Sequence, residues 1–199
     1  MGLLEDYKKE LDESSIPPRS KESQRWYLEK VSEIKASINL RAYQVELMQL
    51  KSLKTPFVGR MFTFFYDPKG KNTLPYFDRF PLIFMVGINE KTFFGINLHY
   101  LPLDLRQQLF YRLLERVNKN VYDPSTFIRI DYEYLKSFRK LRAYKPCFKQ
   151  YAISNVRGKI INVPSSEWET AMYLPTAWWK RMPEEVVHQK SRREYNNNA

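Results

Sequence analysis

Residues 57–104 read FVGRMFTFFYDPKGKNTLPYFDRFPLIFMVGINEKTFFGINLHYLPLD, the densest run of apolar and aromatic residues in the chain. Residues 58–66 are rich in aromatic and β-favouring side chains, which predicts a strand. Residues 82–86 form a continuous apolar run of buried-strand length. Residues 92–99 return after a short polar connection, which predicts a hairpin. The pattern indicates a small, strongly bent antiparallel β-sheet or barrel.

Proline and glycine mark the turns around these strands. Pro68 presets the φ angle of a turn that Gly70 can complete with a positive φ. Pro75 makes its segment an edge or a loop, because proline donates no hydrogen bond to a sheet. Gly95, in the middle of a strand, predicts a bulge or a close backbone approach. Pro102 is favoured in the first turn of a helix, so we expect the sheet to lead directly into one.

The following segments carry helix signals and then strand signals. Residues 103–119 have apolar side chains every four positions, which predicts a helix whose arginines, Arg106 among them, lie mostly away from the buried stripe. Residues 132–144 predict a second helix. Residues 148–155 and 159–163 predict two strands that pair through an Arg-Gly hairpin turn.

The N-terminal segment is a candidate for a long helix. Residues 22–53 contain no glycine or proline, and their apolar residues recur at broadly helical spacing, so an unbroken helix would span roughly 45 Å. One interpretation is an ordinary surface helix with a break near residues 37–39. The other is an arm that packs on a neighbouring subunit. The arm would present these side chains to the partner: Trp26, Tyr27, Val31, Ile34 and Ile38.

These elements define the expected fold and domains. The fold class is α+β: a small, strongly bent antiparallel β-sheet or barrel of SH3-like size, with inserted helices and a long N-terminal helix. Residues 1–55 form the helical arm. Residues 56–199 form a single α+β domain with a basic helical insert at residues 103–149.

Two parts of the central stretch carry a family resemblance. FFYDPKGKNTLPYFDRFPL at residues 64–82 and FFGINLHYLP at residues 93–102 resemble a signature of virion structural proteins from tailed, T4-like bacteriophages with contractile tails. The resemblance implies a non-enzymatic component of the tail, baseplate or neck, or a protein that binds the DNA end.

Positive charge is concentrated in one part of the chain. The net charge is +11, and residues 106–163 hold +9 of it, with 13 Lys and Arg against 4 Asp and Glu. Such a block needs a polyanionic partner or an acidic protein neighbour. Within it, residues 136–149 contain six basic and no acidic side chains, interleaved with aromatic residues. The predicted contacts to nucleic acid or an acidic partner are Lys136, Arg139, Lys140, Arg142, Lys145 and Lys149.

Composition limits the compartment and the class of protein. The chain has 199 residues, 43% of them hydrophobic and 16% aromatic, which suits one domain with a real core. No apolar run is long enough for a membrane span, and the acidic N-terminus lacks a signal-peptide core. Cys147 is the single cysteine, so no intramolecular disulfide is possible. We expect a virion protein that is assembled in the cytoplasm of a bacterial host.

Catalytic and cofactor sites are poorly supported. His99 has no partnered acid at motif spacing and is interpreted as a structural histidine, while His188 is expected on the surface of a basic helix. One cysteine and two histidines cannot form a cysteine-rich zinc site, and the chain has no glycine-rich phosphate loop. Asp67 and Asp78 flank the proline-containing loop and are interpreted as turn residues rather than metal ligands. We therefore expect no enzyme, no cofactor and no small-molecule substrate.

Two functions follow from these observations. The first is a non-enzymatic phage virion component, a tail, baseplate or neck assembly protein with extensive contacts to other virion proteins. The second is a protein that contacts or protects the phage genome end through the basic segment at residues 106–163, binding double-stranded DNA independently of its sequence.

Overall fold

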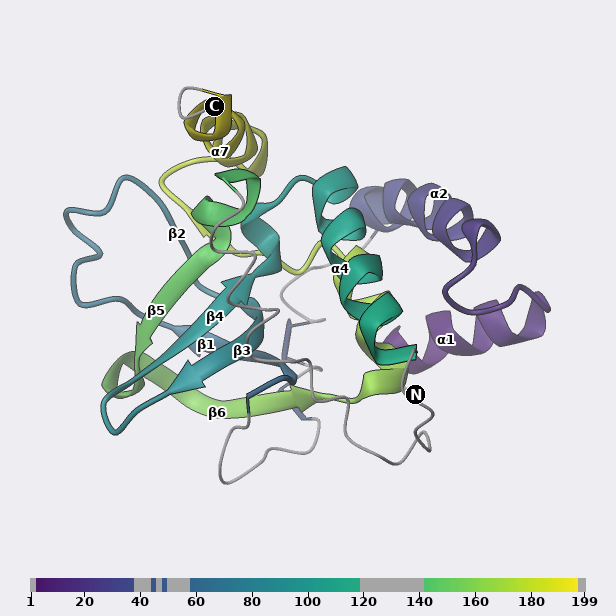
Figure 1. Cartoon of the computed structure of the whole chain (residues 1–199), viewed down its shortest axis with the longest axis horizontal. Coiled ribbons are helices and arrows are strands. Elements are labelled where there is room, and N and C mark those ends of the chain that lie inside the picture. The colour runs from purple at the N-terminus through teal and green to yellow at the C-terminus, as the bar shows by residue number, and fades with distance from the viewer. Residues whose placement is uncertain (1–2, 38–43, 46–47, 50–57, 119–141, 197–199) are drawn as a thin grey trace.

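The computed structural model describes residues 3–37, 44–45, 48–49, 58–118 and 142–196 (Figure 1). The fold is α+β and is built on a five-stranded antiparallel sheet. Its strands are β1 (Met61–Tyr66), β3 (Leu82–Ile88), β4 (Thr92–Asn97), β5 (Phe148–Ala152) and β6 (Val156–Val163). The α-helices are α1 (Leu3–Glu13), α2 (Lys21–Ser37), α4 (Leu103–Asn118), α6 (Trp168–Tyr173) and α7 (Glu184–Asn196). None of these described helices is long and apolar enough to cross a membrane.

The central stretch supplies the middle of the sheet, as predicted. The strand order is β5-β4-β3-β1-β6, so its three long strands lie side by side. The hairpin between β3 and β4 turns at Asn89, whose side-chain oxygen accepts hydrogen bonds from the backbone N–H groups of Lys91 and Thr92. Asparagine is suited to this role because its short polar side chain can satisfy the turn backbone locally.

A second sheet, of two strands, begins where the proline-containing loop ends. β2 (Phe77–Asp78) pairs antiparallel with β7 (Trp179–Lys180). The loop is therefore anchored at its end to a segment about one hundred residues further along the chain. The prediction of an edge strand or loop after Pro75 is confirmed, but its pairing partner was not foreseen.

The sequence predicts a strongly bent sheet or barrel, but the described residues show neither a closed barrel nor a strong curl. In the described residues the sheet is open, and β5 and β6 form its two edges. The edges approach each other at one corner, where η3 (Ile153–Asn155) joins them and the Tyr66 ring of β1 lies 4.9 Å from the Tyr151 ring of β5, centroid to centroid. Because β6 pairs with β1 rather than with β5, the sheet does not close through backbone hydrogen bonds.

The predicted hairpin at Arg157-Gly158 is wrong for the same reason. Both residues lie inside β6, which runs along β1. Gly158 has a φ of +81° and lies where the β1–β6 register shifts. The glycine therefore accommodates this irregularity within a strand and does not form a turn. The change of direction occurs earlier, in the 3-10 turn of η3.

Gly95 is a point of close approach, as predicted. A Cβ atom there would lie 2.6 Å from Cδ1 of Ile83 and 2.9 Å from its Cβ. The register shift is in the neighbouring strand, between Met85 and Gly87 of β3. The bulge therefore lies in β3, and the glycine that permits the close approach lies in its partner strand β4.

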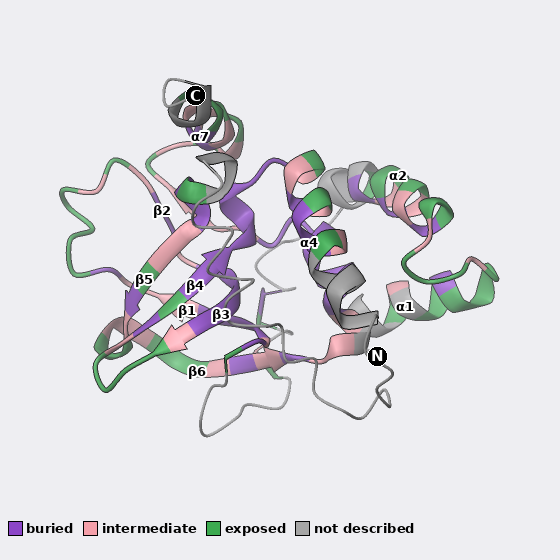
Figure 2. Cartoon of the chain, in the orientation of Figure 1, coloured by how far each residue is buried: buried purple, intermediate pink, exposed green. Residues whose placement is uncertain are grey.

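Buried side chains fill both faces of the sheet. Figure 2 shows β1, β3 and β4 as mostly buried, whereas the edge strands β5 and β6 are mostly half-buried or exposed. On the helix-covered face, Phe84 lies 6.5 Å from Phe110 of α4 and 5.1 Å from Trp168 of α6, centroid to centroid. The other face holds a separate, largely aromatic cluster. Its buried members are Phe62, Phe64, Ile83, Met85, Phe93 and Tyr151.

The helix predicted at residues 103–119 is confirmed as α4, with Asp104 in its first turn. Arg106 does not lie away from the buried stripe. Its side chain is buried, and its guanidinium donates hydrogen bonds to the carbonyl oxygens of Met172 and Leu101. This arginine ties α4 to the end of α6, a use of charge that helical spacing alone does not reveal. Of the helix predicted at residues 132–144, residues 132–141 lie outside the described residues, and residues 142–147 form the 3-10 helix η2 (Arg142–Cys147) instead.

Candidate nucleic-acid interface

The basic segment chosen from the sequence is only partly described. Lys136, Arg139 and Lys140 lie outside the described residues, as does the side chain of Arg142. The side chain of Lys145 is exposed in η2 (Arg142–Cys147). Lys149, in β5, is half-buried, and its Nζ lies 3.9 Å from the centroid of the Tyr100 ring. This segment as a contact surface therefore stays a prediction.

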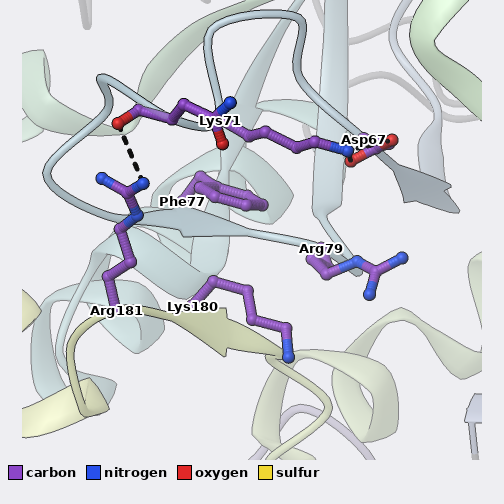
Figure 3. A pocket seen from close by; sticks show the side chains of 7 residues that line it. Asp67, Lys71, Phe77, Arg79, Lys180 and Arg181 are labelled. Atoms are coloured by element: carbon purple, nitrogen blue, oxygen red, sulfur yellow. Dashed lines mark hydrogen bonds and ion pairs between the residues drawn. The ribbon is translucent and has the colours of Figure 1, made fainter.

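The described residues reveal a second basic surface, a pocket of about 350 Å³ beside the two-stranded sheet (Figure 3). We call it the basic pocket. The residues that line it are Asp67, Lys71, Asn72, Phe77, Arg79, Lys180 and Arg181. Four of these seven are cationic and one is a carboxylate, so the lining has a net positive charge. Figure 1 shows the loop that carries Asp67 and Lys71 on the opposite side of the molecule from α1 and α2.

Local turn chemistry shapes one wall of the basic pocket. The backbone N–H of Lys71 donates to the carbonyl oxygen of Pro68, and that of Thr73 donates to Gly70, so the loop folds back on itself. Arg181 holds the loop from the other side. Its guanidinium donates to the carbonyl oxygens of Asn72 and Leu74 at 2.9 Å each. Arg181 itself has a φ of +73°, a strained conformation for a residue with a side chain.

The carboxylate in the basic pocket is surrounded by cations. Nζ of Lys71 lies 3.0 Å and 3.1 Å from the two carboxylate oxygens of Asp67, and the guanidinium of Arg157 lies 3.7 Å away. The hydrogen bond from Lys71 and the positive charges of Lys71, Arg157 and Arg79 lower the pKa of Asp67. The lowered pKa follows from these same cations, which place Asp67 in positively charged surroundings.

Two further cations lie together over an indole ring. The Arg79 guanidinium carbon is 4.7 Å from the centroid of Trp178, and Nζ of Lys180 is 5.1 Å from it. Strand pairing explains this proximity, because the backbone N–H of Arg79 donates to the carbonyl oxygen of Trp178. Arg79 and Lys180 are therefore diagonal neighbours on one face of the two-stranded sheet.

A buried cluster of hydrogen-bonded polar side chains joins the two segments that carry the pocket cations. The carboxylate of Asp78 accepts a hydrogen bond of 2.6 Å from Nδ1 of His99, and Nε2 of His99 lies 3.0 Å from Oγ1 of Thr176. Asp78 also accepts hydrogen bonds from the backbone N–H groups of Phe80 and Trp178. Burial acts to raise the pKa of Asp78, but His99 and the two N–H groups outweigh it, so the pKa is lowered. The cluster thereby fixes the segment that bears Trp178 against the segment that bears Arg79.

The remaining titratable groups have structural surroundings. His99 is buried and bonded at both ring nitrogens, as expected for a structural histidine, although its acid partner Asp78 was missed. His188 is not a simple surface residue, because its Nε2 donates to the carbonyl oxygen of His99 at 3.0 Å and burial lowers its pKa. Cys147 is fully buried, which raises the pKa of its thiol. Among the residues the structure describes, no group of three or more His, Cys, Asp or Glu side chains could hold a metal ion.

Of the side chains predicted to bind a partner through the N-terminal arm, some pack within this chain and others lie outside the described residues. Tyr27 and Val31 are buried within this chain, and the Tyr27 ring stacks on Tyr173 of α6 with centroids 4.7 Å apart. Trp26 is half-buried and packs beside them. The side chain of Ile34 and all of Ile38 lie outside the described residues. The division of the chain at residue 55 and the arm's contact with a partner stay predictions.

Sequence reasoning missed the basic pocket because its cations come from two distant segments. Lys71 and Arg79 precede Lys180 and Arg181 by about one hundred positions, so no local charge run marks the site. A weak signal was present in residues 177–181, which combine aromatic and basic side chains.

Comparison with known proteins gives one match. Neither the curated proteins nor the solved structures contain a matching relative. The sequence profile of a family described as "Phage T4 terminal DNA protecting protein" matches residues 5–193, which include the N-terminal helices, the sheet and most of α7. The chain belongs to this family of phage terminal DNA protecting proteins.

Proposed function

We propose that the chain binds the end of a phage genome and protects it from degradation. The observation that carries this proposal is the family match over residues 5–193, since the family is described by that activity. It favours the second of the two functions inferred from the sequence. The family description gives no support to a role in the tail or baseplate.

The charge distribution supports the same function. The net charge of +11 suits a polyanionic partner, and the basic pocket adds a described surface to the positively charged segment. Contacts of this kind recognise phosphate groups rather than bases. A protein that guards a genome end needs such sequence-independent binding, because it must hold whatever sequence the end presents.

The proposal also includes a location. A protein that protects an end until the DNA is delivered has to stay with that DNA, so we place it in the virion beside other phage proteins. Mass spectrometry of purified particles tests this placement, and particles without the protein would contradict it.

We expect the protein to slow exonuclease digestion of a linear duplex. It should bind that duplex more tightly than a covalently closed dumbbell of the same length, because only the linear molecule has ends. Binding should weaken as salt rises: the logarithm of the association constant should fall against the logarithm of the salt concentration with a slope of about 0.9 per phosphate neutralised. Fluorescence anisotropy at two salt concentrations and a timed exonuclease digest measure both effects. Equal affinity for the two DNA forms, with no protection, would show a general DNA-binding protein instead.

A second experiment concerns the basic segment. Replacing Arg139, Lys140 and Arg142 with glutamate should weaken DNA binding sharply, because each attraction becomes a repulsion. If the three side chains are solvent-exposed, the changes should alter the free energy of unfolding by only about 0.5 kcal/mol each. Thermal unfolding and anisotropy on the same samples separate the two effects. A triple variant that binds DNA like the parent would remove this segment from the interface.

A further inference from the structure

We propose that the basic pocket binds the terminal phosphate monoester of a DNA strand. This inference rests on the proposed function for its ligand and assigns that ligand to a defined place. The pocket lies between the loop at residues 67–72, β2 and β7, and its volume of about 350 Å³ is large enough for a phosphate group.

Charge favours the strand terminus over the strand interior. A phosphate monoester carries close to two negative charges at neutral pH, because its second pKa is about 6. An internal phosphodiester carries one. The lining has four cations, Lys71, Arg79, Lys180 and Arg181, against the carboxylate of Asp67. A site with this surplus of positive charge gains more from the doubly charged group.

The cations divide into a scaffold pair and a binding pair. Arg181 is committed to the carbonyl oxygens of Asn72 and Leu74, and Lys71 is committed to Asp67. These bonds fix the loop in place before any ligand arrives. Arg79 and Lys180 make no ion pair among those the structure records, and they extend from neighbouring strands on the same face (Figure 3). We assign the direct contacts with the phosphate to this second pair.

The ring beside these two cations holds them together at the pocket. Trp178 is half-buried and packs against Phe65 with centroids 6.1 Å apart. The Arg79 guanidinium carbon and Nζ of Lys180 lie 4.7 Å and 5.1 Å from the Trp178 centroid, so one ring positions both cations. Two cations held this close can meet the oxygens of one phosphate group.

The test uses the full chain and three blunt duplexes of one sequence, which carry a 5′-phosphate, a 3′-phosphate or hydroxyls only. We expect one of the two phosphorylated ends to bind about tenfold more tightly than the hydroxyl end, the usual worth of a charged hydrogen bond. The variant Arg79→Gln/Lys180→Gln should lose this preference, so that it binds the phosphorylated and the hydroxyl duplexes with equal affinity. The preference of the parent should also shrink below about pH 6, where the monoester loses its second charge.

A matched control removes the same charges elsewhere. Lys21→Gln/Arg25→Gln changes one lysine and one arginine, both exposed on α2 and on the opposite side of the molecule from the pocket loop. It should keep the preference for the phosphorylated end. If the double pocket variant unfolds at a lower temperature, the single variant Lys180→Gln replaces it, because that side chain makes no recorded hydrogen bond within the chain.

The outcomes separate this inference from the proposed function. No binding to any duplex overturns the proposed function and this site with it. Binding to duplex ends with no preference for a phosphate leaves end protection standing and overturns the pocket assignment. A preference that survives in Arg79→Gln/Lys180→Gln, or one that is lost equally in the α2 control, places the phosphate elsewhere and also overturns it.

Discussion

Replacing Asp78 with alanine is expected to lower the free energy of unfolding by about 3–5 kcal/mol, because it leaves several buried hydrogen-bond donors without an acceptor. The side chain is 1% exposed and pairs with a histidine that is fully buried. It accepts hydrogen bonds from Nδ1 of His99 and from the backbone N–H groups of Phe80 and Trp178. Without the carboxylate, these three donors are left buried without their acceptor, and each such group costs free energy.

Chemical denaturation of parent and variant measures this change. Asp104→Ala is the control, because Asp104 pairs with Arg192 on the surface, where the two side chains are 61% and 54% exposed. Its loss should cost less than about 1 kcal/mol. If Asp78→Ala unfolds at the same denaturant concentration as Asp104→Ala, the buried cluster does not stabilise the fold.

The same pair predicts a dependence on pH. The folded-state pKa of Asp78 is lowered relative to its unfolded value of about 3.9. Its contribution to stability is therefore fully present above that unfolded value and is lost as the pH falls through the folded pKa. The difference in unfolding free energy between the parent and Asp78→Ala should thus be constant near neutrality and shrink below about pH 4.

The central sheet could be predicted because its signals are local. β1, β3 and β4 each carry an apolar or aromatic run, and Asn89 gives the hairpin turn its own acceptor. The helix α4 could also be predicted, because its apolar side chains recur every four positions. Where the predictions failed, the deciding contact was distant. Arg157-Gly158 has turn chemistry, but pairing of β6 with β1 determines what the segment becomes.

The site shows the same division between local and distant information. Asp78 and His99 are 21 positions apart, and Thr176 is 77 positions beyond His99. A search for partners at motif spacing does not find such a cluster. The two stretches that carry the resemblance contain Asp78 and His99, and in the structure these residues bring the two walls of the basic pocket together. Sequence reasoning identified the correct stretch but assigned its aspartates to turns.

The second large effect is expected from Phe64→Ala, which should cost about 3–5 kcal/mol of unfolding free energy. The Phe64 ring is fully buried on the face of the sheet opposite α4 and α6. Its centroid lies 5.2 Å from that of Phe93, 5.3 Å from that of Tyr151 and 6.2 Å from that of Tyr66. Truncation leaves a cavity and removes all three edge-to-face contacts at once, each favourable beyond the area it buries.

Thermal unfolding measures the cost, and at about 2–4 °C per kcal/mol for a chain of this size the midpoint should fall by roughly 10 °C. Phe94→Ala is the matched control: the same truncation in β4, at a ring that is 39% exposed. It should stay within about 1 kcal/mol of the parent. The comparison isolates burial, because residue type and strand environment are shared. Three of the rings around Phe64 come from β1, β4 and β5, so this cluster joins strands that do not all pair with one another. If the two variants melt together, the aromatic cluster is not a second core, and the helix-covered face alone must hold the sheet.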